Sequence, residues 1–328
     1  MSPLPTFADV QAAARRLEGV TIRTPLLENE RVNRALGGRL FIKAECLQRT
    51  GSFKLRGAYN FLAAMTDADR AKGVVGWSSG NHAQGLAEAA RLMGVKATIV
   101  MPSDAPALKV ANTRASGAEV ILYDRVKESR EAIGHGIAEK TGATIVPPYD
   151  HPWILTGQGT AGIEIAEQAK AAGVTLDAVA APCSGGGLAT GVALGVQGLS
   201  PTTAVHAGEP AGFDDLARSL ASGTKQKNEK LSGSICDALL APTPGDVTFP
   251  LAQKVLGPGL VVSDDEVLDA MELAFREFKL VVEPGGAVAL AAALTGKLLV
   301  KGRAVAVVCS GGNVDHETFK RALGRAKA

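Results

Sequence analysis

The chain has few aromatic residues and almost no excess charge. Phe, Trp and Tyr make up 4% of its 328 residues, and the net charge is +2. Few rings are therefore present to stack on unpaired bases. No strong basic field would attract nucleic acid or an anionic membrane. The composition argues against both as partners.

Long uninterrupted hydrophobic runs are also lacking. The stretch Ala178–Val205 carries no charge, but Pro182, Pro201 and many small residues interrupt it. It is a poor membrane span and predicts a buried strand, a glycine loop and a buried helix instead. The N-terminus shows no basic stretch followed by an apolar one, so no signal peptide is visible.

Cysteine is scarce and scattered. The four cysteines, Cys46, Cys183, Cys236 and Cys309, form neither a C-x-x-C pair nor a metal-finger spacing. A chain of this size needs no disulfides, so reduced thiols and a cytoplasmic location are predicted. Cys183 and Cys309 are interpreted as small buried hydrophobes rather than nucleophiles.

What the sequence does contain is an alternation of apolar strand runs and helical stretches. Strands are predicted at Leu40–Ala44, Val74–Trp77, Ala97–Met101, Val120–Tyr123, Ala178–Ala181, Ala204–Ala207 and Ala304–Cys309. Helices are predicted after Thr6, over Ala83–Met93 and over Val267–Phe278. This alternation predicts an α/β fold with parallel strands joined by right-handed crossovers. The polar stretch Ser222–Ser234 predicts a surface loop.

Three glycine-rich loops follow predicted strands, and each is expected to open a helix: Ser78–Asn81, Ser184–Gly187 and Ser310–Asn313. Ligands of open parallel sheets bind beyond the carboxyl ends of the strands. The three loops are therefore expected to meet at one crevice. Glycines let backbone N–H groups close on a phosphate at a helix N-terminus, although such a loop alone is also typical of a tight turn.

A fourth glycine pattern, Gly157–Gly162, matches G-x-G-x-x-G. No strand is predicted before it, and no acidic residue lies at the distance that a dinucleotide site requires. Helix packing is the favoured interpretation.

Lys54 lies between Phe53 and Leu55. Apolar neighbours lower the pKa of an amine and make it a usable nucleophile. A solvated lysine at a helix start is the alternative, and the surrounding Gly-Ser-Phe-Lys-x-Arg-Gly-Ala pattern argues against it.

Taken together, these motifs resemble those of fold-type II pyridoxal-phosphate (PLP) enzymes, in the threonine/serine dehydratase and serine racemase family. The matching segments run in family order along nearly the whole chain: Ser52–Ala58, Ser78–Gln84, Gly157–Ala161 with Glu164, Ser184–Leu188, Gly208–Asp215, Glu283–Ala289 and Ser310–Asp315. The resemblance implies two open parallel-sheet lobes, similar to the tryptophan synthase β-chain, with PLP in the cleft between them. It implies a discontinuous large cofactor-binding domain (1–71 and 149–328), a small mobile domain (72–148) and a homodimer.

The resemblance also implies roles for individual residues. Lys54 would carry PLP as a Schiff base and remove the Cα proton. Phe53 would pack beside the ring, Asn81 would bond the ring hydroxyl, and Ser310 would face the pyridine nitrogen. The implied phosphate cup comprises Ser184, Gly185, Gly186, Gly187 and Leu188, with Ser184 at a frequent glycine position. The implied substrate-carboxylate loop comprises Ser78, Ser79, Gly80, Asn81 and His82.

The implied activity is conversion of L-threonine, L-serine or a related β-hydroxy amino acid to a 2-oxo acid and ammonia, by an ammonia-lyase. Two alternatives stay open. The first alternative is an amino acid racemase, because Ser79 matches the serine that serves in racemases as a second base on the face opposite the lysine. The second alternative is a catalytically silent amino-acid sensor.

Two further features bear on ions and substrate. Glu209, Asp215 and the Phe213 carbonyl match a divalent cation site, for Mg²⁺ or another such cation, although two surface acids are the alternative. Asp237-Ala238 stands where relatives have Asp-Gly. The extra methyl of Ala238 is expected to shift the tilt of the ring or to narrow the substrate space. The apolar Leu239-Leu240-Ala241 that follows favours a larger or more apolar β-hydroxy amino acid.

Overall fold

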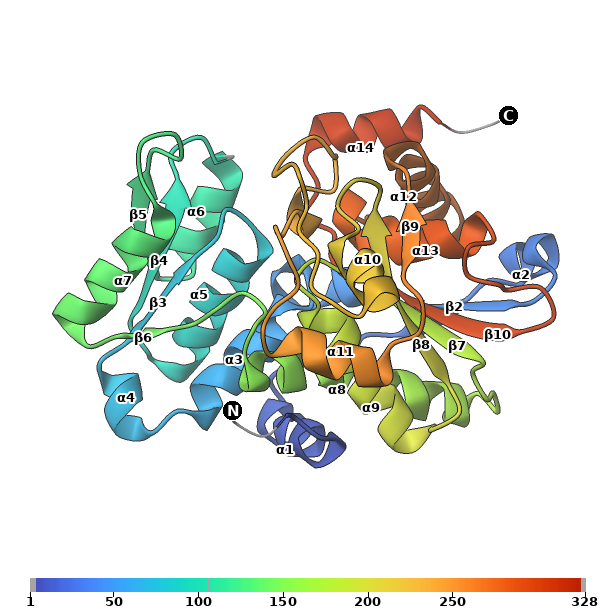
Figure 1. The fold of residues 1–328 in the computed structure, drawn as a ribbon, viewed down its shortest axis with the longest axis horizontal. Helices are drawn as coiled ribbons and strands as arrows, with labels where there is room; N and C mark the ends of the chain where they lie inside the picture. Colours follow the sequence, from blue (N-terminus) through green and yellow to red (C-terminus); the bar gives the residue numbers. More distant parts are fainter. Residues whose placement is uncertain (1–3, 106, 326–328) are drawn as a thin grey trace.

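Two parallel-sheet lobes lie side by side in the computed structural model, which describes residues 4–105 and 107–325 (Figure 1). The larger sheet has six strands, ordered β1 (Leu26–Glu28), β2 (Arg39–Lys43), β10 (Ala304–Val308), β7 (Ala178–Pro182), β8 (Ala204–Pro210) and β9 (Leu260–Val262). The smaller has four, ordered β5 (Glu119–Tyr123), β4 (Ala97–Pro102), β3 (Val74–Trp77) and β6 (Thr144–Ile145). The predicted α/β fold with two parallel-sheet lobes is confirmed.

One strand departs from the parallel pattern. β1 pairs with β2 in the antiparallel direction, whereas the other strand pairs of both sheets are parallel. β1 and β9 have three residues each, too short for a strand pattern to stand out in the sequence. The prediction of parallel strands therefore missed this edge.

Helices cover both faces of the six-stranded sheet. One face carries α12 (Asp264–Phe278), α13 (Pro284–Leu294) and α14 (His316–Leu323). The opposite face carries α8 (Pro152–Ala171), α9 (Gly187–Leu199), α10 (Asp215–Ser222) and α11 (Thr248–Val255). α1 (Phe7–Leu17) packs on α8 and α9, and α2 (Glu30–Leu36) lies beside β2. Because both faces are covered, the central strands β7 and β10 are apolar along their whole length.

The small lobe contains α4 (Asp67–Ala71), α5 (Asn81–Met93), α6 (Ala107–Ala115) and α7 (Arg130–Thr141). Its core also contains Leu55, Phe61 and Leu62 of α3 (Lys54–Ala64), which packs on both α5 and α8. α3 thus joins the two lobes, and Lys54 begins it. The strands of the small sheet all fall within the predicted 72–148 segment.

The G-x-G-x-x-G pattern lies inside α8, as helix packing requires. A Cβ added to Gly159 would lie 2.7 Å from the Gly191 carbonyl oxygen, and one on Gly162 would lie 2.3 Å from that of Val192. α8 and α9 therefore approach backbone to backbone, which only glycine permits. A dinucleotide loop at this position is excluded.

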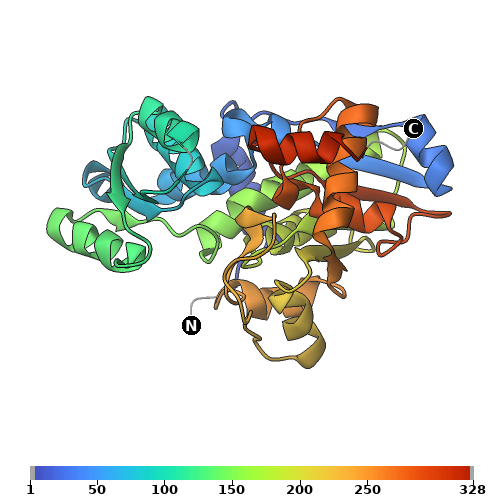
Figure 2. The same ribbon diagram turned by 90° about the horizontal axis from the view of Figure 1, so that it is seen from above.

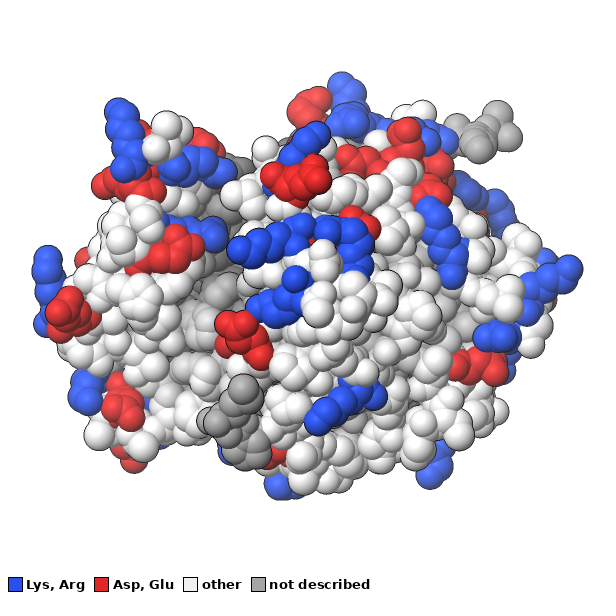
Figure 3. All heavy atoms as spheres, in the orientation of Figure 1, with Lys and Arg blue, Asp and Glu red and all other residues white. Residues whose placement is uncertain are grey.

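The two glycine loops that precede α5 and α9 open those helices as predicted. The third does not, because Ser310–Asn313 is followed by α14 only at His316, with Asp315 as its N-cap. Figures 1 and 2 show the small lobe at one end of the molecule, facing the loops that follow α10. Figure 3 shows a hollow between the lobes, with Lys and Arg side chains on both of its rims.

Candidate active site

Lys54 lies at the junction of the two lobes. The Phe53 N–H donates to the Ser310 carbonyl at 3.1 Å, which ties the start of α3 to the third glycine loop. A Cβ on Gly85 of α5 would come within 3.0 Å of the Lys54 backbone and Cβ, so only a glycine lets α5 approach this closely. Both contacts fix the Lys54 backbone between the lobes.

The amine of Lys54 is held by a hydrogen bond and has a lowered pKa. Its Nζ donates to the Pro148 carbonyl at 2.8 Å and lies 5.3 Å from the centre of the Phe53 ring. Burial lowers the pKa of Lys54 to about 8, with the Glu283 charge opposing the shift. A lysine with this pKa is partly neutral near neutral pH, as a nucleophilic amine must be.

The loop Ser184–Gly187 forms a cradle at the N-terminus of α9. Gly186 has a φ of 100°, and a Cβ on Gly185 would lie 2.1 Å from the Tyr149 ring. The Gly185 carbonyl accepts from Thr248 Oγ1 at 2.7 Å, which braces the loop from behind. The buried Thr190 Oγ1, one turn into α9, has no hydrogen-bond partner within residues 4–105 and 107–325. An unpaired hydroxyl and a helix N-terminus behind glycines fit a phosphate group.

A chain of side-chain hydrogen bonds crosses the cleft at Asn81. Asn81 Nδ2 donates to Glu283 Oε1 at 2.5 Å, and Asn313 Nδ2 donates to Asn81 Oδ1 at 2.8 Å. Asn313 also donates to the Thr50 carbonyl. Burial raises the pKa of Glu283 to about 7, and the Asn81 hydrogen bond opposes that shift. The Asn81 amide is therefore held in a defined orientation between α5 and the N-terminus of α13.

Ser310 lies among the same groups. It is buried, its N–H donates to the Gly286 carbonyl at 3.3 Å, and its own carbonyl accepts from Phe53. A Cβ on the next residue, Gly311, would lie 2.1 Å from Glu283 Oε1 and 3.2 Å from Asn81 Nδ2. The first and third glycine loops thus meet beside Lys54.

The loop Ser78–His82 connects β3 to α5 on the small-lobe side. Gly80 N–H donates to Ser78 Oγ at 3.2 Å, and His82 Nε2 lies 3.0 Å from the Val146 carbonyl. Burial, and then the Lys54 charge, lower the pKa of His82 to about 3. His82 is therefore neutral, and a small pocket of about 40 Å³ is lined by Ser78 and Ser79 together with Arg130 and other residues.

The predicted cation site contains two buried carboxyl groups, and neither forms a salt bridge with any residue that the structure describes. Glu209 is buried and accepts from the Leu216 and Ala217 N–H groups at 3.0 and 2.7 Å. Asp215 Oδ1 accepts from Asn228 Nδ2, while its buried Oδ2 has no hydrogen-bond partner in the described part of the chain. Burial raises the pKa of both carboxyls, that of Asp215 to about 6, and the Asp215 charge adds to the shift at Glu209. The described residues contain no cluster of three or more His, Cys, Asp and Glu ligands, so a cation here would also need carbonyl oxygens and water.

Behind Lys54, a buried ion network anchors α3. The fully buried Arg56 guanidinium donates to both oxygens of Glu45 at 2.7 and 2.8 Å, and to those of Glu164 at 2.7 and 2.9 Å. Lys43 Nζ donates to Glu164 Oε2 at 2.5 Å. The four charges balance, as buried charges must. They tie α3 to β2 and α8.

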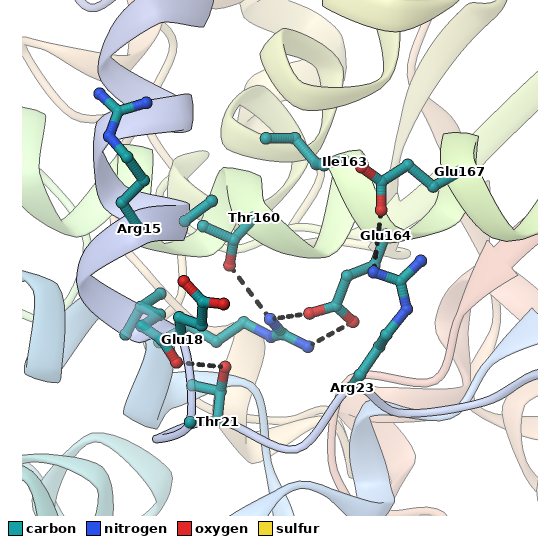
Figure 4. A pocket seen from close by; sticks show the side chains of 12 residues that line it. Arg15, Glu18, Thr21, Arg23, Thr160, Ile163, Glu164 and Glu167 are labelled. Carbon is teal, nitrogen blue, oxygen red and sulfur yellow. Dashed lines mark hydrogen bonds and ion pairs between the residues drawn. The ribbon is translucent and has the colours of Figure 1, made fainter.

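A cavity of about 370 Å³ opens onto this network between α1 and α8 (Figure 4). Its lining includes Arg56 and Glu164, whose bonds are made within the network, and Arg23, which pairs with Glu167 at 2.8 Å. Among the described residues, those predicted for cofactor, substrate or cation do not line it. The chemistry-bearing groups lie in the cleft instead.

The structure thus brings Lys54, Asn81, Ser310 and the substrate loop together, with the phosphate cradle joined to them through Pro148 and Tyr149. The sequence analysis missed Tyr149 and Asn313, and it did not assign a role to Glu283. Asn313 lies within the third glycine loop, and Glu283 begins the second-to-last matching segment, so their positions carried a signal. Tyr149 carried none, because only the folded chain brings it against Gly185.

Comparisons with known proteins agree with this geometry. A family model described as "Pyridoxal-phosphate dependent enzyme" matches residues 17–311. L-threo-3-hydroxyaspartate ammonia-lyase of Pseudomonas sp is 44% identical over 98% of this chain and 99% of that protein. Serine racemase of Schizosaccharomyces pombe is 38% identical, covering 98% of each chain. The solved structure of maize serine racemase superposes with a TM-score of 0.91 at 36% identity, covering 98% of each chain.

The chain therefore belongs to the family of pyridoxal-phosphate dependent enzymes. It is an enzyme of the ammonia-lyase type with PLP as cofactor, and its relatives include both ammonia-lyases and serine racemases. When bound, PLP supplies an electron sink for charge that develops at the Cα of an amino acid.

Proposed function

We propose that this protein converts a β-hydroxy amino acid to a 2-oxo acid and ammonia, with Lys54 as the residue that carries PLP and removes the Cα proton. A proton is lost from Cα and the hydroxyl group from Cβ, so one water is released. One water is then taken up when the resulting imine is hydrolysed, so each turnover yields one 2-oxo acid and one ammonia. The observation that carries the proposal is the Lys54 amine, whose pKa is lowered to about 8 at the junction of the lobes.

The surrounding residues would divide the binding among them. The cradle Ser184–Leu188 would hold the phosphate, Phe53 would pack against the ring, Asn81 would bond the ring hydroxyl, and Ser310 would donate to the pyridine nitrogen. A hydroxyl cannot offset a full positive charge on that nitrogen, whereas a carboxylate can. Ser310 therefore favours a neutral ring and prompt loss of the β-hydroxyl.

The substrate carboxylate would be held by the loop Ser78–His82. Ser78 and Ser79 offer hydroxyl donors, and they directly precede the N-terminus of α5, where helix N–H groups are available to an anion. Since His82 is neutral, hydrogen bonds rather than a histidine charge would bind the carboxylate. Figure 1 shows this loop at the small lobe's edge of the gap between the lobes.

The test of Lys54 is its replacement by Ala. Lys54→Ala is expected to lose the visible absorbance of covalently held PLP and to lower kcat by at least ~10³-fold, because both the attachment point and the base are gone. Lys72→Ala, at an exposed lysine of the small lobe, is the matched control and should keep both. Turnover by Lys54→Ala at the parental rate would refute the assignment.

Racemisation is the second candidate activity, because Ser79 lies in the loop that faces the cleft and a serine racemase is 38% identical to this chain. A base on the face opposite Lys54 would return a proton to Cα with inverted geometry. Incubation with L-serine separates the two activities: pyruvate and ammonia report elimination, and D-serine reports racemisation. Ser79→Ala should abolish D-serine formation while elimination continues.

Three finer features complete the proposal. A divalent cation, Mg²⁺ or another, would be held by Glu209, Asp215 and the Phe213 carbonyl, which the unpaired Asp215 Oδ2 supports. The four cysteines are free thiols, which supports a reducing, cytoplasmic setting. The described part of the chain contains no helix that is both long and apolar enough to cross a bilayer. The oligomeric state is a separate point. We propose a homodimer from the family resemblance, and light scattering of the purified protein would test this proposal.

A further inference from the structure

Lys109 on α6 reaches across the cleft to the large lobe. Its Nζ lies 3.5 Å from Asp237 Oδ2, and the two side chains are 20% and 66% exposed. Asp237 begins a short 3-10 helix, Asp237–Leu239, in the loops that follow α10. In Figure 1, α6 of the small lobe and these loops face each other across the gap between the lobes.

The same Nζ lies over the substrate loop. A Cβ on Gly80 would be 3.8 Å from it, so the ammonium group borders the loop proposed to hold the substrate carboxylate. Its charge also reaches Glu283, the buried carboxyl that orients Asn81, and opposes the rise in the pKa of that carboxyl. Lys109 thus places a positive charge beside the loop proposed to hold the substrate carboxylate.

The partner that holds Lys109 in the free protein is a weak one. Strong charge-assisted hydrogen bonds are about 2.7–2.9 Å long, and the Lys109–Asp237 distance of 3.5 Å is longer. Asp237 is also mostly solvated, and exposed ion pairs contribute little because water screens them. An anion that entered the cleft would therefore compete well for this ammonium group.

On the large-lobe side, the residues that follow Asp237 are apolar. Ala238 and Leu239 follow Asp237, and both lie within 3.2 Å of the Cβ position of Gly285. Serine or threonine would bring only one carboxylate, for which the serine loop already provides donors. A substrate with a second carboxylate on Cβ would bring an anion that this apolar wall cannot bind, whereas Lys109 can.

We propose that Lys109 is a specificity-determining residue that binds the second carboxylate of a β-hydroxy dicarboxylic amino acid, such as 3-hydroxyaspartate. The inference rests on the proposed elimination of a β-hydroxy amino acid and names its preferred substrate class. Binding exchanges the long contact with Asp237 for a closer one with substrate. Asp237 then acts as a placeholder that keeps the ammonium group at the cleft.

The first experiment compares kcat/KM for L-threo-3-hydroxyaspartate and for L-serine in holoenzyme variants. Lys109→Met should lower the ratio of the two values roughly 10- to 100-fold, the range expected for one charge-assisted hydrogen bond. Lys109→Arg, which keeps the charge, should restore part of the ratio. Lys96→Met, at an exposed lysine of the same lobe, is the control and should leave the ratio unchanged. Asp237→Asn should lower KM for hydroxyaspartate.

Arg130 is the rival cation, since it lines the small pocket beside Ser78 and Ser79. Its Nε donates to Glu131 at 2.8 Å within its own lobe. If Arg130→Gln collapses the selectivity ratio and Lys109→Met does not, the assignment to Lys109 is overturned. An equal fall for both substrates in Lys109→Met would overturn it as well, since that result describes a general structural role.

A binding measurement keeps the inference testable without turnover. Succinate and propionate differ by one carboxylate. Calorimetric titration of the holoenzyme with each therefore measures how much the second carboxylate contributes to the binding free energy. Wild-type protein should bind succinate more tightly, and Lys109→Met should remove roughly 10-fold or more of that difference. If the wild-type protein bound succinate no more tightly than propionate, the inference would be refuted. A clear preference in a protein that eliminates neither amino acid would instead count against the proposed function alone.

Discussion

The buried carboxyl of Glu283 orients Asn81 of the proposed cofactor site, and its burial lowers the stability of the folded protein when the carboxyl is ionised. It is 4% exposed, and its Oε1 accepts from Asn81 at 2.5 Å. That hydrogen bond orients the amide proposed to meet the cofactor ring. In the sequence, Glu283 is the start of a matching segment, and an acidic residue at this position is also typical of a helix N-terminus. Only the folded position beside Asn81 and Gly311 separates the two.

Glu283→Gln should change how stability depends on pH. The pKa of Glu283 is raised from 4.5 to about 7, so its contribution to stability is full below pH 4.5 and is lost as pH rises through 7. Gln cannot ionise and still accepts from Asn81. Between pH 5 and 8, wild type should therefore lose on the order of 2–3 kcal/mol relative to the variant. Urea unfolding at both pH values measures this, and parallel pH profiles would contradict it.

At the scale of elements, the α8–α9 pair decides how closely the large lobe packs behind the site. A Cβ on Gly191 would lie 2.4 Å from the Leu155 carbonyl oxygen, and one on Gly195 would lie 2.2 Å from that of Gly159. The G-x-G-x-x-G pattern of the sequence thus serves contact between two helices. Because α9 begins at the phosphate cradle and α8 contacts α3, this packing also fixes the distance between cradle and Lys54.

Gly191→Ala should destabilise the protein although alanine is the better helix former. The gain in helix propensity is about 1 kcal/mol, whereas the methyl group would have to push α8 and α9 apart, at a cost of 1–3 kcal/mol or more, on the order found for overpacked cores. We expect a net loss of about 1–2 kcal/mol in the free energy of unfolding. Calorimetric or urea unfolding would measure it.

Gly136→Ala is the matched control for that prediction. Gly136 lies within α7, and a Cβ there would meet nothing within 4 Å. The same substitution should therefore stabilise the protein by about 0.5–1 kcal/mol. If both variants shifted in the same direction, backbone contact between α8 and α9 would not be the cause.

At the scale of the whole molecule, the proposed cation site joins β8 to α10 and to the loops that end at Asp237. Glu209 lies on β8, Asp215 begins α10, and Asn228 connects Asp215 to the Ala241 carbonyl. Ala241 N–H in turn donates to Ser184 Oγ at 3.1 Å, at the phosphate cradle. A cation bound by the two carboxylates would therefore stabilise the hydrogen bonds that connect Asp215 through Asn228 and Ala241 to Ser184 of the phosphate cradle.

Divalent cations should stabilise the protein more at high pH than at low pH. The pKa values of both carboxyls are raised, that of Asp215 to about 6, so without a cation their contribution falls as pH rises through about 6. Added Mg²⁺ or Ca²⁺ should raise Tm by several degrees at pH 8 and far less at pH 5. EDTA should reverse the increase.

The matched variants for the cation test are Asp215→Asn and Asp214→Asn. Asp215→Asn should abolish the cation-dependent rise in Tm. Asp214, the preceding residue, pairs with Arg218 at 3.4 Å, so its substitution should leave the rise intact. A rise that survives in Asp215→Asn would place the cation elsewhere.

Local sequence was sufficient for elements whose signals are short-range. The Thr6–Asp9 capping box, Gly94 at the end of α5 and the apolar runs of β3, β4, β7 and β8 each carry their own signal, and each is present in the structure. Propensity, capping and glycine geometry act over a few residues. The edge strands β1 and β9 were missed because three residues carry no period.

By itself, the sequence determined the strand-end glycine loops and the lysine with apolar neighbours, and their motifs and order indicate the proposed PLP site. Only the tertiary structure decided which charges act on them. Lys109 and Asp237 are far apart in sequence, as are Tyr149 and Gly185, and Asn81 and Glu283. Their contacts depend on how two sheets and α3 are placed in space, because electrostatic and steric effects follow distance between atoms rather than position along the chain.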